Sequence, residues 1–210
     1  MNYKALIPFA ALLLSGCATA TLPQGPNIYS LAPRPGAATI LVAQPADQRT
    51  DKKRLGSIGA LSLSMKADPS ELLAKEMVAA LYEQNVNGVM GHVSSGAPAD
   101  FAQAARQANA QGVLALNIRS ISIKSFDALM DPPTAEVTLQ ASLYNSQGNT
   151  VESDTVTGHV QKRINTFSSE RATGELVGEA IHDAAQRLMG TGALGGALKK
   201  LSANTTNENQ

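Results

Sequence analysis

The chain has 210 residues, with 17 basic and 17 acidic side chains and a formal net charge of zero. Hydrophobic residues make up 43% of it, enough for a globular core, whereas aromatic residues make up 4% and tryptophan is absent. No basic excess is present to neutralise phosphates and few rings are available for stacking, so the composition argues against a nucleic-acid partner.

The first residues have the layout of a secretory signal. One positive charge, Lys4, precedes an apolar run over 5–14, and the small residues Ser15 and Gly16 follow. The run is shorter than the roughly 20 apolar residues that span a bilayer. We therefore expect residues 1–16 to be a signal peptide that is removed, and the motif at its end makes it a lipoprotein signal peptide.

The sequence around Cys17 makes the signal more specific. Leu14-Ser15-Gly16-Cys17 resembles a lipobox, the cleavage site of the lipoprotein signal peptidase, and Cys17 is the sole cysteine. A single cysteine in a secreted chain forms no internal disulfide, so its thiol needs another explanation. The resemblance implies cleavage before Cys17 and three acyl chains on that residue, which together anchor a protein firmly. By resemblance to the usual sorting pattern, Ala18 in place of Asp implies the outer membrane, with the domain facing the periplasm.

The next residues, 17–36, are rich in proline and glycine and predict a flexible, lipid-anchored tether. Part of it, such as 28–31, has the composition to lie against the domain. At the other end, residues 191–210 form a glycine-rich segment and a polar tail that we expect to be disordered. The folded domain is therefore expected over 37–190.

Hydrophobic patterning predicts the elements of this domain in chain order. The expected elements are a buried strand at 38–43, a glycine-bearing ribbon or hairpin at 55–63, a helix at 69–84 capped by Asp68, a weak strand at 89–93, an alanine-faced helix at 98–110, a strand at 113–123, a hairpin of strands 134–144 and 151–164, and a helix from 168–169 to 190. Apolar residues change parity within 113–123, which predicts a β-bulge near Arg119-Ser120. The fold class is α/β (α+β): a single mixed β-sheet with about three packed helices, ending in a β-hairpin and then a helix.

Four features together resemble the YajG-like family of bacterial lipoproteins. They are the lipobox, the strand at 38–43, the stretch Ala46-Asp47-Gln48-Arg49-Thr50-Asp51 directly after it, and the order of the later elements. The resemblance implies an envelope location and a fold but almost no chemistry. The order of elements also resembles, more loosely, a periplasmic domain of the curli secretion lipoprotein, of lipoprotein activators of penicillin-binding proteins and of the N-terminal part of the Tol translocation protein. That resemblance implies protein contacts or assembly rather than catalysis.

The candidate site is the polar loop that carries Asp47, Arg49 and Asp51. Acid and base alternate there after a strand, so Arg49 can offer two parallel hydrogen bonds to a carboxylate or phosphate. The structural interpretation, which the pattern favours, is that Asp47 and Asp51 cap the loop and pair with Arg49, stabilising the turn. The following run 52–54 is basic and is expected to be solvated, with contact to anionic headgroups as a minor alternative.

The sequence contains no recognisable catalytic pattern. His92, His159 and His182 have no helical spacing to one another and there is no second cysteine, so we expect no metal site, no catalytic residue and no cofactor. The sequence therefore predicts a non-catalytic binding or assembly module, attached to the membrane through its N-terminal lipid and partnered by an envelope protein. The alternatives are a structural subunit of an envelope secretion or appendage complex and, less favoured, an envelope hydrolase.

Overall fold

The computed structural model describes residues 17–58, 61–125, 132–163, 169–190 and 192–207. Its elements along the chain are β1 (Cys17–Ala20), the 3-10 turn η1 (Ile28–Ser30), β2 (Thr39–Ala43), β3 (Ala46–Asp47), β4 (Arg54–Ile58), β5 (Leu61–Met65), α1 (Ser70–Glu83), β6 (Asn87–Gly91), α2 (Pro98–Gln107), β7 (Gly112–Ser125), β8 (Thr134–Asn145), β9 (Thr150–Gln161), α3 (Ser169–Gly190) and α4 (Ala193–Asn207).

Within these ranges the strands form one mixed sheet, as the sequence predicts. Its order is β1-β5-β4-β7-β2-β6, and β8 and β9 continue from β7 as an antiparallel meander. Strand β7 is long enough to pair with β2 near its start and with β4 near its end, both in parallel. The predicted ribbon at 55–63 is the antiparallel pair β4–β5, and the predicted weak strand is β6.

A β-bulge in β7 keeps the buried face of the sheet continuous. The register between β7 and β8 shifts between Ile118 and Ser120, which confirms the bulge predicted from the change of parity. Because one extra residue is absorbed there, Ile118 and Ile121 are both buried on the same face although they are three residues apart. Arg119 then points away from the core and hydrogen-bonds to Gln48 and Gln140.

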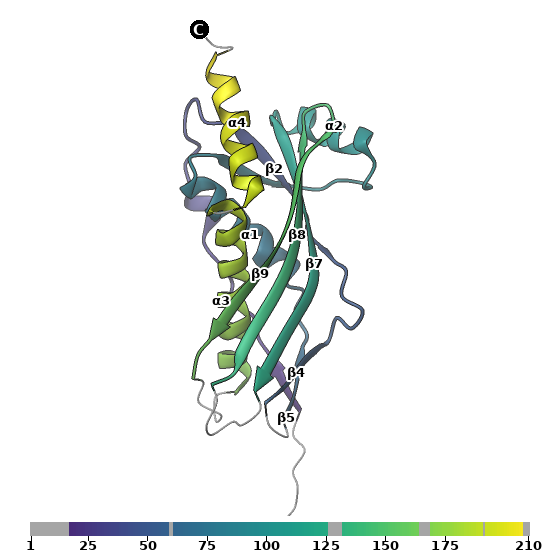
Figure 1. Cartoon of the computed structure of the whole chain (residues 1–210), viewed down its shortest axis with the longest axis vertical. Coiled ribbons are helices and arrows are strands. Elements are labelled where there is room, and N and C mark those ends of the chain that lie inside the picture. The colour runs from purple at the N-terminus through teal and green to yellow at the C-terminus, as the bar shows by residue number, and fades with distance from the viewer. Residues whose placement is uncertain (1–16, 59–60, 126–131, 164–168, 191, 208–210) are drawn as a thin grey trace, which may run out of the picture.

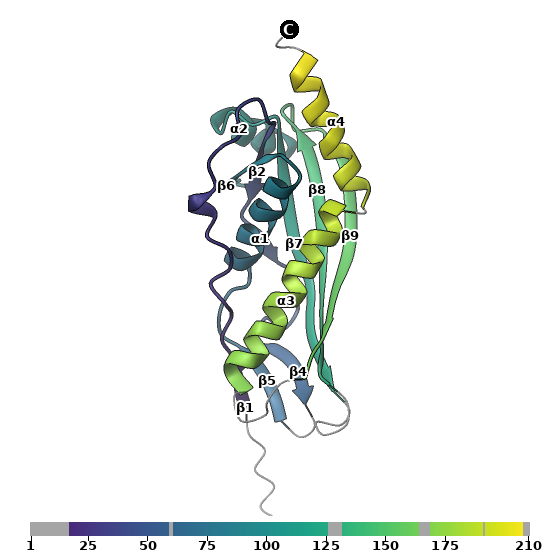
Figure 2. The same cartoon turned by 90° about the vertical axis from the view of Figure 1, so that its left-hand side faces the viewer.

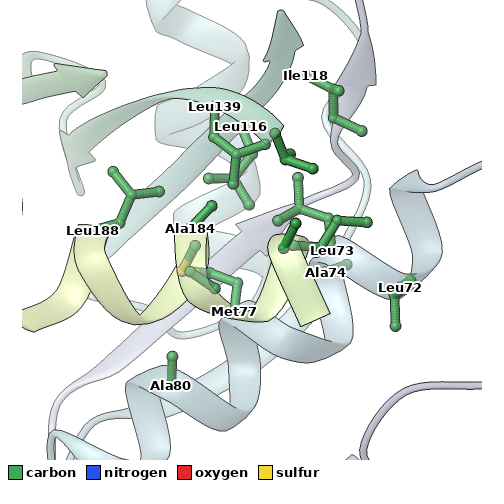
Figure 3. Close-up of a cluster of buried hydrophobic side chains, with 14 of the residues drawn as sticks. Leu72, Leu73, Ala74, Met77, Ala80, Leu116, Ile118, Leu139, Ala184 and Leu188 are labelled. Atoms are coloured by element: carbon green, nitrogen blue, oxygen red, sulfur yellow. The ribbon is translucent and has the colours of Figure 1, made fainter. Parts of the chain in front are cut away.

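Helices cover the two faces of the sheet unequally. Helices α1, α3 and α4 lie together on one face, and α2 lies on the other near one end (Figure 1). Figure 3 shows the main core, where Met77 of α1 and Ala184 of α3 meet the sheet residues Leu116 and Leu139. The smaller core under α2 holds Phe101, whose ring stacks on Tyr144 at a centroid distance of 3.9 Å. The sheet, not any one helix, therefore organises the domain.

The segment expected as a free tether, 17–36, instead lies along the domain. Residues Cys17–Ala20 form β1, parallel to β5, and bury the side chains of Ala18 and Ala20. Farther along, Ile28 and Leu31 pack against the main core. Figure 2 shows this segment running beside α1 from the lower end of the molecule to the upper. Small side chains let β1 fit closely under α3, a long-range contact that local composition does not reveal.

The segment expected as a disordered tail also differs from the prediction. Residues Ala193–Asn207 form helix α4, in which Leu194 and Leu198 are almost completely buried. These leucines pack with β8 and β9 and with the end of α3. Burial of two leucines offsets the low helix propensity of the adjacent glycines, because tertiary packing outweighs intrinsic preference.

Close packing of α3 on β9 depends on Gly158. A Cβ atom built there would lie 2.2 Å from the carbonyl oxygen of Ala180 and 2.6 Å from the amide nitrogen of Ala184, both helix backbone. We expect Gly158→Ala to lower the free energy of unfolding by about 1–3 kcal/mol, because the helix must move. Gly196→Ala in α4 is the matched control: its Cβ would meet nothing within 4 Å, so stability should stay or rise. Urea denaturation of both variants measures this, and equal stability would contradict the packing described.

Candidate functional site: the loop after strand β3 and its cavity

The loop that the sequence singles out begins where β3 pairs with the bulged part of β7. Asp47 lies opposite Ile118 in that parallel pairing, and the amide of Gln48 donates to the carbonyl of Ile118 at 3.0 Å. The backbone before Arg49 is thus fixed by the sheet. The sequence folds this way because the buried strand β2 is followed at once by a short polar segment. This segment lies beside the bulge of β7, where the β7 side chains point away from the core.

Asp47 and Arg49 form a buried ion pair. The Arg49 Nε donates to Asp47 Oδ1 at 2.9 Å and its Nη2 donates to Asp47 Oδ2 at 2.7 Å. The exposed fractions of the two side chains are 4% for Arg49 and 8% for Asp47. Arg49 Nη2 also donates to the carbonyl of Lys52 at 3.0 Å, which closes the loop. The two-bond geometry expected of Arg49 is therefore present, but its partner is Asp47.

One nitrogen of the guanidinium is left over. Arg49 Nη1 is buried and has no hydrogen-bond acceptor among the residues that the structure describes. An unsatisfied buried donor costs about 1–3 kcal/mol.

Asp51 has a different role from Asp47. Its Oδ1 accepts the amides of Lys53 at 3.0 Å and Arg54 at 3.1 Å, which caps the start of β4. These backbone bonds, that of Arg54 first, hold the pKa of the Asp51 carboxyl below its ordinary value. The structure thus brings Asp47 and Arg49 together, while Asp51 makes its bonds to the backbone on the exposed side of the loop.

A cavity of about 430 Å³ opens beside this loop. Its walls come from the loop itself and from the segment that joins β5 to α1. The lining residues are Asp47, Arg49, Lys52, Lys53, Ser64, Met65, Lys66, Ala67, Asp68 and Pro69. Three lysines against two acids, with Arg49 in the wall, give the cavity a basic character that the neutral whole chain lacks.

Lys66 is the residue of this cavity that sequence reasoning missed. It follows β5, far from the loop in sequence, and the amide of Met65 donates to the carbonyl of Lys53 at 2.7 Å, which brings the two segments together. The signal that could have found it is the predicted ribbon at 55–63, because a hairpin places the residues before and after it side by side.

The Asp47 carboxyl makes stability depend on pH. Burial opposes its ionisation, but the hydrogen bonds and charge of Arg49, with the charge of Lys52, hold the pKa of Asp47 below its ordinary value. Asp47 therefore contributes stability that is fully present above about pH 4, the unfolded-state range, and is lost as pH falls through the lower folded-state pKa. We expect the urea midpoint to fall on acidification more steeply in the parent than in the double variant Asp47→Leu/Arg49→Met. Parallel pH profiles would contradict this assignment.

The three histidines lie on separate elements. His182 Nδ1 lies 2.8 Å from Glu76 Oε2, and His159 Nδ1 lies 3.8 Å from Glu136 Oε1. His92 is exposed after β6. Among the side chains that the structure describes, no three of the metal-ligating types gather. In the serine-bearing loop after His92, the Ser95 hydroxyl bonds to Asp100 and accepts the amide of Ala97, so it is engaged at the start of α2.

The lipidation candidate, Cys17, lies at the first described residue of the chain and is the first residue of β1. No helix in the described ranges combines the length and the apolarity needed to cross a bilayer. The last residue of the sequence motif at 14–17 is therefore the first residue of this strand.

Comparison with known proteins relates the chain through its fold. No protein-family model and no curated protein matches it. The fold is similar to that of protein XCC0632 from Xanthomonas campestris, of the DUF330 family, with a TM-score of 0.50 and 16% identity over 92% of this chain and 99% of that one.

Two further solved structures are more distant. The PelC dodecamer from Paraburkholderia phytofirmans gives a TM-score of 0.47 and 14% identity, covering 80% of this chain and 92% of that one. Lipoprotein GNA1162 from Neisseria meningitidis gives 0.39 and 13%, covering 81% and 96%. At these identities the likeness concerns the fold alone. The YajG-like resemblance is not confirmed and stays a prediction.

Proposed function

We propose that this protein is an outer-membrane lipoprotein, acylated on Cys17, that acts in the periplasm as a non-catalytic binding or assembly module. The observation that carries the proposal is the sequence 14–17, whose sole cysteine stands where a lipobox would place it. Acyl chains on that residue would attach the domain to the membrane, since each buried methylene contributes about 0.8 kcal/mol.

The outer membrane is favoured by Ala18 under the usual sorting pattern. The same side chain is buried in β1 beneath the helices, so packing also requires a small apolar residue there. Sorting and folding thus favour the same residue type at this position.

The cavity beside Arg49 supports a binding role. Lys52, Lys53 and Lys66 are exposed at its rim and can contact anionic groups without first giving up a buried partner. The Asp47–Arg49 pair beneath them holds the loop in place. A rigid, locally basic cavity on a neutral domain suits an acidic segment of an envelope protein, because complementary charge favours correct encounter over non-specific attraction.

The attachment is tested by the mature N-terminus. Mass spectrometry of the protein from its native envelope should find a triacylated Cys17 with residues 1–16 removed, and Cys17→Ser should abolish the modification. An unmodified Cys17 in the mature protein would contradict the proposal that the protein is a lipoprotein.

The binding site is tested by charge removal at the cavity. A photo-crosslinking residue at exposed Ala67 should give crosslinked products in the native envelope. Lys52→Gln/Lys53→Gln/Lys66→Gln should abolish them without changing thermal stability. The matched control is Lys199→Gln/Lys200→Gln, at two exposed positions of α4, which should leave the products unchanged. Undiminished crosslinking in the triple variant would show that the three lysines do not form the binding site.

A further inference from the structure

A single row of paired residues crosses the lower end of the sheet from Cys17 to the end of β9. Each member is the register partner of the next across five neighbouring strand pairs. The row is Cys17, Ser62, Ser57, Lys124, Thr134 and Gln161. Strands β4, β7 and β9 end close to this row, and β5 and β8 begin at it. Figure 2 shows β1, β4 and β5 together at this end, far from the C-terminus. The lipidation candidate therefore lies at one extreme end of the domain.

The backbone after Cys17 is held in place by hydrogen bonds and close packing. β1 is paired with β5 from its first residue, and the amide of Thr21 donates to the carbonyl of Glu170 in α3 at 3.2 Å. α3 approaches so closely that a Cβ atom on Gly174 would lie 1.7 Å from the Thr21 carbonyl oxygen. Lys75 of α1 then donates to the carbonyl of Gln24 at 3.3 Å. The sheet and two helices thus fix the chain from Cys17 onward.

We propose that the end of the sheet that carries the Cys17 row faces the membrane surface, with strands β7–β9 running upright from the bilayer. This inference rests on the proposed acylation of Cys17. Acyl chains in the bilayer hold residue 17 at headgroup level, and the fixed strand transmits that position to the whole sheet. The turn 145–149 between β8 and β9 then points away from the membrane. At 3.3–3.4 Å per residue, the twelve residues of β8 place it about 40 Å above the row.

Charge does not select this orientation. Three of the basic side chains near the row are paired with carboxylates: Lys124 with Glu136 at 2.8 Å, Lys162 with Glu179 at 2.5 Å and Arg171 with Glu175 at 2.8 Å. Exposed Arg163 has no carboxylate partner among the described residues and adds a single charge. Such paired charges offer little net attraction to anionic headgroups. The lipid and the rigid strand therefore set the orientation, which should be the same on zwitterionic and anionic membranes and in high salt.

The absence of tryptophan from the sequence gives a clean measurement. Gln161→Trp places a fluorophore in the row and Gln147→Trp places one in the opposite turn, both at exposed glutamines. The acylated full chain is reconstituted in phosphatidylcholine vesicles that carry nitroxide-labelled headgroups, and again in vesicles containing phosphatidylglycerol. We expect a large loss of fluorescence for Gln161→Trp and none for Gln147→Trp, in both vesicles and at high salt.

A linker variant provides the control. Twenty flexible Gly/Ser residues inserted between Cys17 and Ala18 span about 25 Å and free the domain, so the difference between the two tryptophans should shrink. Equal quenching in the parent, with the protein bound, would overturn the upright orientation while leaving the acylation intact. Loss of the difference in phosphatidylcholine alone would overturn the claim that charge plays no part. Failure of the acylated protein to bind vesicles at all would refute lipid anchoring and the orientation with it, and an unacylated Cys17 in mass spectrometry would refute the proposed acylation separately.

Discussion

Asp47→Ala alone should lower the free energy of unfolding by about 3–5 kcal/mol, the usual cost of removing one partner from a buried ion pair. The variant leaves the Arg49 guanidinium almost completely buried, and the Lys52 carbonyl is its remaining acceptor among the described residues. The loss is large because the buried charge that remains has lost its counter-ion. Urea denaturation at pH 7 measures it.

The double variant Asp47→Leu/Arg49→Met distinguishes the contribution of the ion pair to stability from that of side-chain packing. Replacing both charged side chains with apolar ones should recover most of the loss, because no buried charge is left. Recovery of stability in the double variant would show that the ion pair is not required for stability. Binding at the cavity could then be compared between the double variant and the parent. A double variant as unstable as Asp47→Ala would show that Arg49 is needed for its stem packing or for the loop closure through Lys52.

Removal of both terminal segments should have the other large effect. A chain trimmed to 37–190, the span that the sequence predicts as the whole folded unit, lacks β1, the segment along α1 and helix α4. The two leucines of α4 alone, Leu194 and Leu198, are buried to an extent that contributes about 1.5–3 kcal/mol each. We expect the trimmed chain to lose at least about 3 kcal/mol relative to 17–207, or to lose its single cooperative transition in thermal unfolding.

Two single truncations and one point variant complete this test. Chains 37–207 and 17–190 should each be less stable than 17–207, since each loses buried contacts. Tyr29→Ala lies in the same N-terminal segment, but its side chain is 88% exposed and should change stability little. Full stability of 37–190 would restore the free tether and tail that composition predicts.

The elements that the sequence predicted correctly are those with strong local patterns. Alternation over β8, the turn at 145–149 and the parity change in β7 are each confirmed by the register of the sheet. Helix α1 begins as expected, with the Asp68 carboxylate accepting the amide of Ser70 at 2.9 Å. In these segments, side-chain periodicity and capping act within a few residues, so a single sequence contains the information.

The elements that it missed depend on distant partners. β1 has four small residues and no alternation of large ones. It becomes a strand because it pairs with β5 and packs against α3. α4 carries adjacent glycines that weaken helix propensity, which the packing of Leu194 overcomes. At the candidate site, the pairing of Asp47 with Arg49 follows from their spacing. Their burial and the arrival of Lys66 need the β4–β5 hairpin and the bulge in β7 to be in place.

The start of β1 at Cys17 changes how an anchored domain would meet a partner. A protein on a loose tether samples all orientations, and each encounter must wait for the correct one. A domain whose first residue is both the lipid attachment and a sheet residue keeps one principal rotation, about the membrane normal, together with lateral diffusion. The cavity beside Arg49 would then stay at one height above the bilayer. Association with another membrane-bound protein would become a two-dimensional search, and less orientational entropy would be lost on binding because the anchor already restricts the domain's orientation.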